Sequence, residues 1–308
     1  MSIIAVSELV KTYGRFRALD SVSFEVDPGE TFALLGPNGS GKTTALKCLA
    51  GLTVPTSGTL KIGGLDLKRQ PTEARNLISY LPQRVSFHES LTAREVMEFY
   101  CRLRRLNPSR IDQLFSMSSF HFNGSASRPV GQFSGGMIQR LGLAVACLPD
   151  APIILLDEPT VSLDPHGAIE FRAFLTGMKR AGKTIVISSH MLADVEELAD
   201  RVAILVDGKL VGLEPIQSLR QNLENTGRME VVMATPGKEW IDVAVKAGAS
   251  TATIDGESLF ISCAPEKRLD VLRAIESAGG QVVSFSTKET SLEDVYLRYI
   301  GESEKHGK

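Results

Sequence analysis

Long apolar runs are missing from this sequence. None of its apolar stretches approaches the roughly 18 consecutive residues that a membrane-spanning helix needs, so we expect any role at a membrane to depend on a partner protein. A surplus of positive charge is missing too. The formal net charge is -2 at pH 7, which argues against nucleic acid as a partner. With 308 residues, 43% of them hydrophobic, the chain is long enough for about two domains with cores of their own.

Paired cysteines are also lacking. The four cysteines are scattered along the chain and form no C-x-x-C pair. This spacing matches neither the common zinc sites nor a disulfide framework. We therefore expect reduced thiols in or near the core at Cys48, Cys101, Cys147 and Cys263.

One loop of a very specific kind is present. It consists of Gly36, Pro37, Asn38, Gly39, Ser40, Gly41, Lys42 and Thr43. The loop fits the pattern G-x-x-x-x-G-K-[S/T], in which glycines let the backbone N–H groups turn inward around a phosphate. Lys42 has the reach for the β- and γ-phosphates, and the Thr43 hydroxyl suits a place on Mg²⁺.

The residues that flank this loop agree with a phosphate-binding role. Residues 31–35 predict a buried strand before the loop, and residues 44–49 predict a helix after it. The N-terminus of that helix adds a positive partial charge toward the phosphates. A glycine-rich turn that fits the pattern by accident would explain neither flank.

Two acidic residues follow the apolar run 153–156, which predicts a central parallel strand. Asp157 at the end of such a strand suits the organisation of Mg²⁺, and Glu158 suits a base that orients water on the γ-phosphate. A solvated acidic turn is the plain alternative. His190 ends the predicted strand 184–188, at the sheet edge where ligands bind in α/β proteins.

The pattern of elements divides the chain into two parts. Residues 1–220 predict a mixed α/β nucleotide-binding domain with a helical insert over about 84–150. A polar linker over 219–227 follows. Residues 228–308 predict a small accessory domain with the element order βαββαβ, of the ferredoxin-like kind, closed by an amphipathic helix over 292–300.

One further motif completes a known set. Phe133-Ser134-Gly135-Gly136-Met137 resembles the L-S-G-G-Q motif of ATP-binding cassette (ABC) ATPases, from which Phe133 and Met137 depart. The remaining motifs of that family occur in the family's order over residues 1 to about 217. The resemblance implies that Tyr13 stacks on adenine and that Gly36 to Thr44 bind the phosphates. It also implies a Q-loop at Gln83, a Walker B pair at Asp157 and Glu158, a D-loop at Ser162-Leu163-Asp164, and a switch histidine at His190.

The resemblance also implies the architecture. The fold would be a P-loop NTPase with a RecA-like core, an antiparallel β-subdomain and the helical insert. ATP and Mg²⁺ are the implied cofactors, with Thr43, Gln83 and Asp157 around the metal and with Glu158, His190 and Gln83 in catalysis.

The same resemblance implies the assembly. Two chains would pair head to tail, so each ATP site would be completed in trans by Ser134, Gly135, Gly136 and Asp164 of the other chain. The homodimer would serve an integral membrane permease as a peripheral subunit at the cytoplasmic face of the inner or cell membrane. The segment after Gln83 is the candidate contact with that permease.

Residues 92–106 predict a helix that carries several apolar residues on one side. The preceding segment, residues 84–90, holds an apolar Phe87 without periodic partners. Phe87 either packs under the insert or lines a groove for a short helix of the permease. The groove would be completed by Val85 and by the helix that places Val96, Phe99, Tyr100 and Leu103 on one side.

The sequence leaves the transported substrate open. The tail Ser291-Leu292-Glu293-Asp294-Val295-Tyr296-Leu297 resembles that of single-cassette ATPases of export-type and ABC-2-type transporters. Among these, the chain resembles the NosF-type ATPases, which serve copper- and sulfur-related maturation of nitrous oxide reductase. ATPases of drug, sodium or polysaccharide exporters share most of these features. A soluble ABC protein outside transport is less favoured, because such proteins usually carry two cassettes, long coiled-coil insertions or zinc cysteines. Glu158 and His190 argue against a nucleotide-binding scaffold without turnover.

Overall fold

The computed structural model describes residues 2–117, 120, 124–219 and 228–288. The chain divides after Glu214 into two compact units, and each is described by itself. Among the helices of the described residues, none is both long enough and apolar enough to cross a bilayer.

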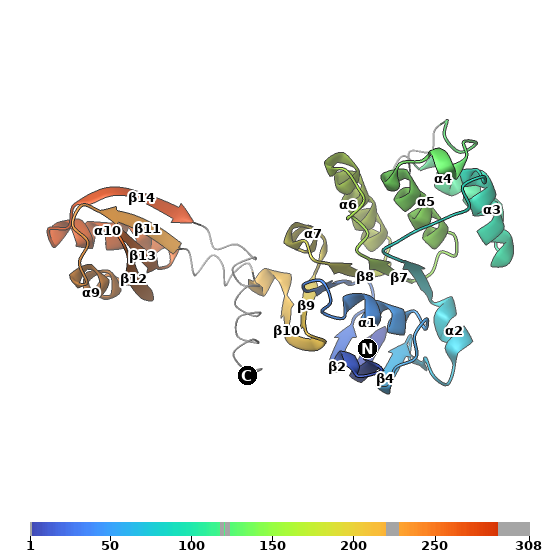
Figure 1. Cartoon of the computed structure of the whole chain (residues 1–308), viewed down its shortest axis with the longest axis horizontal. Helices are drawn as coiled ribbons and strands as arrows, with labels where there is room; N and C mark the ends of the chain where they lie inside the picture. The colour runs from blue at the N-terminus through green and yellow to red at the C-terminus, as the bar shows by residue number, and fades with distance from the viewer. Residues whose placement is uncertain (1, 118–119, 121–123, 220–227, 289–308) are drawn as a thin grey trace. The chain divides into compact units, whose positions relative to one another are not determined.

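A six-stranded sheet forms the centre of the first unit (Figure 1). Its strands, in spatial order, are β10 (Lys209–Pro215), β9 (Arg201–Val206), β3 (Thr31–Leu35), β8 (Thr184–Ser189), β7 (Ile153–Asp157) and β6 (Ile78–Leu81). From β9 to β6, neighbouring strands pair in parallel. Every residue of β3, β7 and β8 is buried, because helices cover a parallel sheet on both faces.

An antiparallel sheet packs beside this one. Its strands are, in order, β2 (Phe16–Val26), β1 (Ile4–Tyr13), β4 (Ser57–Ile62) and β5 (Leu65–Asp66). Helix α1 (Lys42–Leu49) contributes Leu46 and Leu49 to a core that contains residues of both sheets. The strand before the phosphate loop and the helix after it are therefore anchored in one core.

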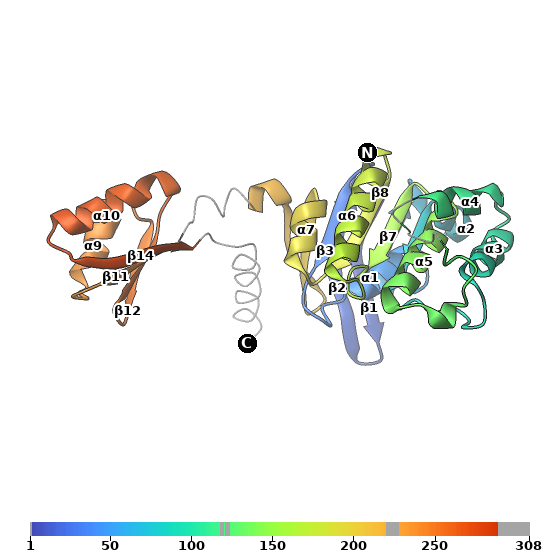
Figure 2. The same ribbon diagram turned by 90° about the horizontal axis from the view of Figure 1, so that it is seen from above.

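The remaining helices surround the parallel sheet (Figure 2). Helix α6 (Pro165–Arg180) contacts β8, and α7 (Leu192–Leu198) contacts β3 and β8. The short helix α2 (Pro71–Asn76) contacts β5 and β6.

The predicted helical insert lies between β6 and β7. It contains α3 (Ala93–Leu103), α4 (Ser109–Ser116), the 3-10 turn η2 (Val130–Gln132) and α5 (Gly135–Cys147). Thr92 and Glu95 form a reciprocal capping box that starts α3. The apolar residues that the sequence places on one side of α3 include Phe99 and Leu103, which are 56% and 66% exposed. The face that packs inward consists of Ala93, Val96, Met97 and Cys101.

The second unit contains a four-stranded sheet and the helices α9 and α10. Along the chain the elements are β11 (Arg228–Met233), α9 (Glu239–Lys246), β12 (Thr251–Asp255), β13 (Ser258–Ser262), the turn η3 (Pro265–Lys267), α10 (Arg268–Ser277) and β14 (Val282–Lys288). The strand order is β12-β13-β11-β14, with every neighbouring pair antiparallel. Met229 and Val231 of β11 join Trp240 and Val271 of the helices in a separate core. The helix predicted over 292–300 lies outside the described residues.

Candidate functional site

The phosphate loop joins the end of β3 to the start of α1, and its backbone requires glycine at two positions. Gly41 has φ 102°, and a Cβ there would lie 2.5 Å from the Ala18 carbonyl oxygen and 2.8 Å from Leu19 Cδ2. At Gly36 a Cβ would overlap the Leu205 carbonyl oxygen. Both positions need glycine because there is no room for a side chain and, at Gly41, because φ is positive.

Lys42 is buried at the first position of α1. Its Nζ donates to the carbonyl oxygens of Gly36 at 2.7 Å and Pro37 at 3.1 Å. The same nitrogen lies 3.2 Å from Glu158 Oε1. The ammonium therefore stands inside the loop that it is predicted to serve, with its three donors satisfied.

Asp157, at the carboxyl end of β7, ties the phosphate loop to the sheet. Its Oδ1 accepts from Thr43 Oγ1 at 3.0 Å and from Ser188 Oγ at 2.7 Å, and its Oδ2 accepts from Tyr80 at 3.3 Å. Burial, followed by the charge of Asp157, raises the pKa of the Tyr80 hydroxyl, which remains a donor. Because β6, β7 and β8 run in parallel, their carboxyl ends bring Asp157 and Ser188 side by side, at the sheet edge where ligands bind in α/β proteins.

Glu158 is held in an unusual conformation directly after β7. It is not a glycine, yet its φ is 47°, a left-handed value that costs about 1–3 kcal/mol and is common at functional sites. Its N–H donates to Ser188 Oγ at 2.9 Å, which fixes the backbone. Its buried carboxylate lies between the Lys42 ammonium on one oxygen and His190 Nδ1 on the other.

His190 follows β8 and connects this carboxylate to the surface. Its side chain is 41% exposed, whereas the carboxylate that it contacts is buried. The two residues that flank His190 hold its backbone turn, because Ser189 Oγ accepts a hydrogen bond from the Met191 N–H at 2.9 Å. The structure therefore places Lys42, Glu158 and His190 in one chain of contacts.

A cavity of about 410 Å³ opens over the phosphate loop. It is lined by Phe16, Ala18, Asn38, Gly39, Ser40, Gly41, Lys42, Thr43, Thr44, Gln83 and Glu158. Gln83 is thus brought to the phosphate loop from the junction of β6 and the helical insert. Ser40 and Thr44 also reach this cavity from the loop itself.

The aromatic residue at the mouth of this cavity is Phe16. Tyr13, the predicted adenine-stacking residue, is 48% exposed and does not appear among the described residues that line the cavity. Lys11 Nζ lies 4.8 Å from the centroid of its ring. Tyr13 and Phe16 are partners at the end of the β1–β2 hairpin. The sequence analysis did not identify Phe16. Its position three residues after Tyr13, across a tight turn, could have indicated that the two side chains lie at the same end of the hairpin.

The predicted trans residues lie elsewhere on the first unit. None of Ser134, Gly135, Gly136 and Asp164 is among the described residues lining the loop cavity. Ser134 caps α5 by accepting from the Met137 N–H at 3.3 Å, and Asp164 caps α6 by accepting from the Gly167 N–H at 3.0 Å. A Cβ on Gly136 would lie 3.6 Å from the Ser162 carbonyl oxygen, so the two motifs share one surface.

The two departures from the family motif are accommodated in this structure. Phe133 is 9% exposed, so it fills an apolar position just before α5. Met137 supplies only its backbone N–H to the Ser134 cap. Gln139, two residues later, is buried and donates to the Pro159 carbonyl oxygen at 3.2 Å, which ties α5 to the segment after Glu158.

Comparison with known proteins identifies relatives that match nearly the whole chain. Residues 19–161 match the ABC transporter family. The uncharacterized ABC transporter ATP-binding protein YxlF of Bacillus subtilis is 35% identical over 97% of this chain and 99% of its own length. The Nod factor export ATP-binding protein I of Rhizobium etli is 32% identical, over 98% and 94% of the two chains. The daunorubicin resistance ATP-binding protein DrrA3 of Streptomyces coeruleorubidus is 29% identical, over 98% and 97%.

A solved structure also matches the first unit. The ATP-binding cassette MJ0796 was determined as a dimer in a post-hydrolysis state with ADP and phosphate. It is 27% identical, covers 69% of this chain and 98% of its own, and superposes with a TM-score of 0.64.

Proposed function

This chain belongs to the ATP-binding proteins of ABC transporters, and we propose that it powers a separate membrane permease through ATP-dependent closure of a head-to-tail dimer. The chain binds ATP and is an ATPase with the nucleotide-binding fold of that family.

The first part of the proposal is the phosphate site. Lys42 is held by two loop carbonyls and one carboxylate, and a phosphate oxygen can replace these partners with a charge-assisted contact. The N–H groups of the loop and of the first turn of α1 complete the cradle. Gly36 and Gly41 keep the loop in this conformation, because a Cβ at either position would meet backbone atoms of neighbouring strands.

Mg²⁺ fits the oxygen donors found beside this loop. Thr43 Oγ1 and Asp157 Oδ1 are 3.0 Å apart at the edge of the cavity that Gln83 also lines. Hydroxyl, carboxylate and amide oxygens are hard ligands of the kind that Mg²⁺ prefers. A bound Mg²⁺ would neutralise developing phosphate charge, and we assign Thr43, Asp157 and Gln83 to hold it.

For hydrolysis, we assign Glu158 as the base that orients the attacking water. Its carboxylate lines the cavity, and its strained backbone is fixed by Ser188. His190 holds one carboxylate oxygen, which limits the rotation of the group. Gln83, which lines the same cavity, completes the catalytic set.

The second part of the proposal is the dimer, and one observation carries it. Ser134 and Asp164, on neighbouring exposed turns, lie outside the ATP cavity of their own chain, yet they form a single surface with free access to a second copy. The dimeric state of MJ0796 supports the same arrangement. Each ATP would then contact the phosphate loop of one chain and Ser134, Gly135, Gly136 and Asp164 of the other.

A mixing experiment tests this arrangement. Lys42→Ala and Ser134→Arg homodimers should each be inactive, because each lacks one half of both sites. In a one-to-one mixture about half of the dimers are mixed, and about a quarter of all sites are intact if pairing is random. We expect ATPase activity to return toward that fraction. Failure of demonstrated heterodimers to regain activity counts against the head-to-tail assembly. Lys47→Ala, an exposed lysine of the same helix, is the matched control and should behave as wild type.

The third part is the contact with a permease. Phe87 is half-buried, and its ring meets Tyr100 of α3 edge to face at 6.2 Å, while Phe99 and Leu103 of the same helix are exposed. Val85 packs against Gly142 of α5 and so belongs to the support beneath this surface. We propose that the surface formed by Phe87, Phe99, Tyr100 and Leu103 receives a short amphipathic helix of the permease. The chain would then work as a peripheral subunit at the cytoplasmic face of the inner or cell membrane.

Export is the direction that we propose. Two relatives carry names that refer to Nod factor export and to daunorubicin resistance, so export of a drug or of a compound like a Nod factor is favoured. Sodium export and the NosF-type maturation role stay predictions. Identification of a permease that co-purifies with the chain tests them, because a permease that partners a copper-type periplasmic protein would favour the latter.

We propose that residues 1–220 form the ATP-binding domain. Residues 228–308 then follow along the chain as a ferredoxin-like accessory domain that stabilises the dimer. Its βαββαβ order and its strand order β12-β13-β11-β14 support that assignment. Removal of the unit should weaken dimer formation and leave the residues of the ATP cavity in place.

A further inference from the structure

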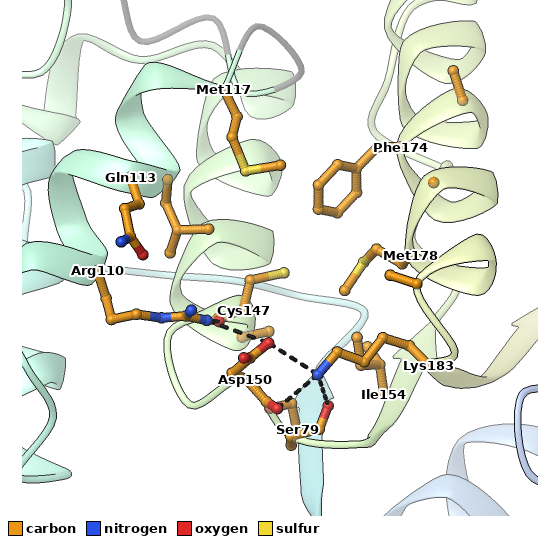
Figure 3. A pocket seen from close by; sticks show the side chains of 16 residues that line it. Ser79, Arg110, Gln113, Met117, Cys147, Asp150, Ile154, Phe174, Met178 and Lys183 are labelled. Carbon is orange, nitrogen blue, oxygen red and sulfur yellow. Dashed lines mark hydrogen bonds and ion pairs between the residues drawn. The ribbon is translucent and has the colours of Figure 1, made fainter.

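A second cavity, of about 470 Å³, lies at the opposite edge of the parallel sheet (Figure 3). Ser79 and Ile154 line it from the amino-terminal halves of β6 and β7, and Lys183 lines it from the position just before β8. The phosphate loop, by contrast, lies at the carboxyl ends of these strands. The two cavities are therefore distinct, and none of their lining residues is shared.

The walls of this cavity are largely apolar. They come from α4 and α5 of the helical insert and from α6 of the core, and they include Leu114, Met117, Ala146, Phe174 and Met178. Its volume falls within the range of about 300–1,000 Å³ that is typical of small-molecule sites. Methionines adapt to ligands of varied shape, which suits a flexible apolar body.

One end of the cavity carries a surplus of positive charge. Lys183 Nζ contacts Asp150 Oδ1 at 2.9 Å and the carbonyl oxygens of Asp150 and Ala151 at 2.7 and 3.1 Å. Arg110 reaches Asp150 Oδ1 at 3.4 Å and the Cys147 carbonyl oxygen at 3.4 Å, both through one terminal nitrogen. A guanidinium has five N–H donors, so Arg110 retains donors for a further acceptor. Two cations and one carboxylate leave this end with a net positive charge.

A buried hydroxyl at the same end lacks a partner. Ser79 is 1% exposed, and its Oγ makes no hydrogen bond within the described part of the chain. Ser79 lines the same cavity as Asp150 and Lys183 (Figure 3). A buried polar group without a partner is costly, and a ligand atom that accepts a hydrogen bond from it would remove that cost.

We propose that this cavity binds a small amphiphile with one carboxylate and an apolar body, of the fatty-acid class. The carboxylate would accept from Arg110 and from Ser79 near Lys183, and the apolar body would lie between α4, α5 and α6. A cationic head would face two positive side chains. A purely apolar ligand would leave the Ser79 hydroxyl unpaired. This site is independent of the proposed transport function, because binding is measured on the chain alone.

Gly177 of α6 offers a clean test. It lines the cavity, and a Cβ built on it meets no atom within 4 Å. Gly177→Leu therefore projects a side chain into the space without a clash at Cβ, and it also removes a helix-weakening glycine. Gly177→Ala is the matched control, since it gives the same helix benefit but fills little of the cavity.

The experiment is calorimetric titration of the full chain with decanoate below its micelle concentration. Decyltrimethylammonium is titrated in parallel. We expect the wild-type chain to bind one decanoate, and to bind decyltrimethylammonium more weakly than decanoate. Decanoate should bind at least about tenfold more weakly to Gly177→Leu than to wild type, and equally well to Gly177→Ala. Ser79→Ala should bind decanoate more weakly while melting at or above the wild-type temperature, which a merely structural serine would not do.

Three results overturn the proposal. The first is no decanoate binding by wild type. The second is equal decanoate binding by wild type and a folded Gly177→Leu, which would place the site elsewhere. The third is ammonium binding as strong as that of decanoate. If Gly177→Leu does not fold, Arg110→Gln decides instead, because the partly exposed Arg110 can be replaced without emptying the core. Unchanged decanoate affinity in Arg110→Gln then counts against the assigned head group.

Discussion

Replacement of Glu158 by glutamine isolates the charge of one carboxylate at nearly constant shape. In the structure this carboxylate is buried, lies 3.2 Å from the Lys42 ammonium and contacts His190. At that distance the attraction to Lys42 is about 5 kcal/mol with an effective dielectric constant of about 20, before desolvation costs are subtracted. In Glu158→Gln, Lys42 keeps its two carbonyl partners and becomes freer to bind phosphate.

Two opposite effects are therefore expected in Glu158→Gln. ATP affinity should stay equal or increase, because Lys42 no longer has a competing carboxylate. Turnover should fall by roughly 10²–10⁴-fold, the usual contribution of a positioned general base, which corresponds to about 3–5 kcal/mol in the barrier.

The assay combines phosphate release at saturating ATP with equilibrium ATP binding. Glu73→Gln, an exposed glutamate of α2, is the control and should match wild type in both. Turnover of Glu158→Gln within a few-fold of wild type, at unchanged affinity, would refute the role assigned to Glu158. A loss of ATP binding would show instead that the carboxylate supports the loop.

Three further predictions follow from the same geometry. Lys42→Ala should abolish tight ATP binding in an equilibrium assay, because the charge-assisted phosphate contact is lost; near-normal affinity would contradict the loop assignment. Gly41→Ala should lower both the melting temperature and ATP affinity more than Gly39→Ala, because only Gly41 lacks space for a Cβ. The Gly39→Ala change adds only positive-φ strain of about 1–2 kcal/mol, and equal effects would be evidence against a steric origin. Phe87→Asp should keep basal ATPase activity within a few-fold but lose the permease in a detergent pull-down, since a desolvated interfacial charge costs several kcal/mol. The control Leu52→Asp, at an exposed position on another surface, should still retain the permease.

Local sequence patterns predicted much of the central sheet. The strand Thr31–Leu35 has the predicted bounds, because short apolar runs between turn residues have few other solutions in an α/β core. The predicted strand over 153–156 was one residue shorter than the observed β7. The spacing of the phosphate-loop motif was sufficient to locate the cavity above it.

Two features depended on tertiary structure and were not predictable. The helical pattern of α3 contains two overlapping apolar stripes, and only the packing of the insert selects Met97 and Cys101 over Phe99 and Leu103. The contacts from Lys42 through Glu158 to His190 depend on the parallel order of β3, β8 and β7. Residues more than a hundred positions apart meet there, and no local pattern reports such a meeting.

The most direct test of the account asks whether ATP brings the phosphate loop of one chain to the Ser134 motif of another. One chain carries Asn38→Cys and the other Gln132→Cys, both exposed positions, in a Glu158→Gln background. The four native cysteines are buried, so a short bismaleimide should react mainly at the introduced thiols. The account predicts cross-linked mixed dimers with ATP and Mg²⁺, few with ADP, and few when the Asn38→Cys chain also carries Lys42→Ala. Equal cross-linking with ATP and ADP would contradict it.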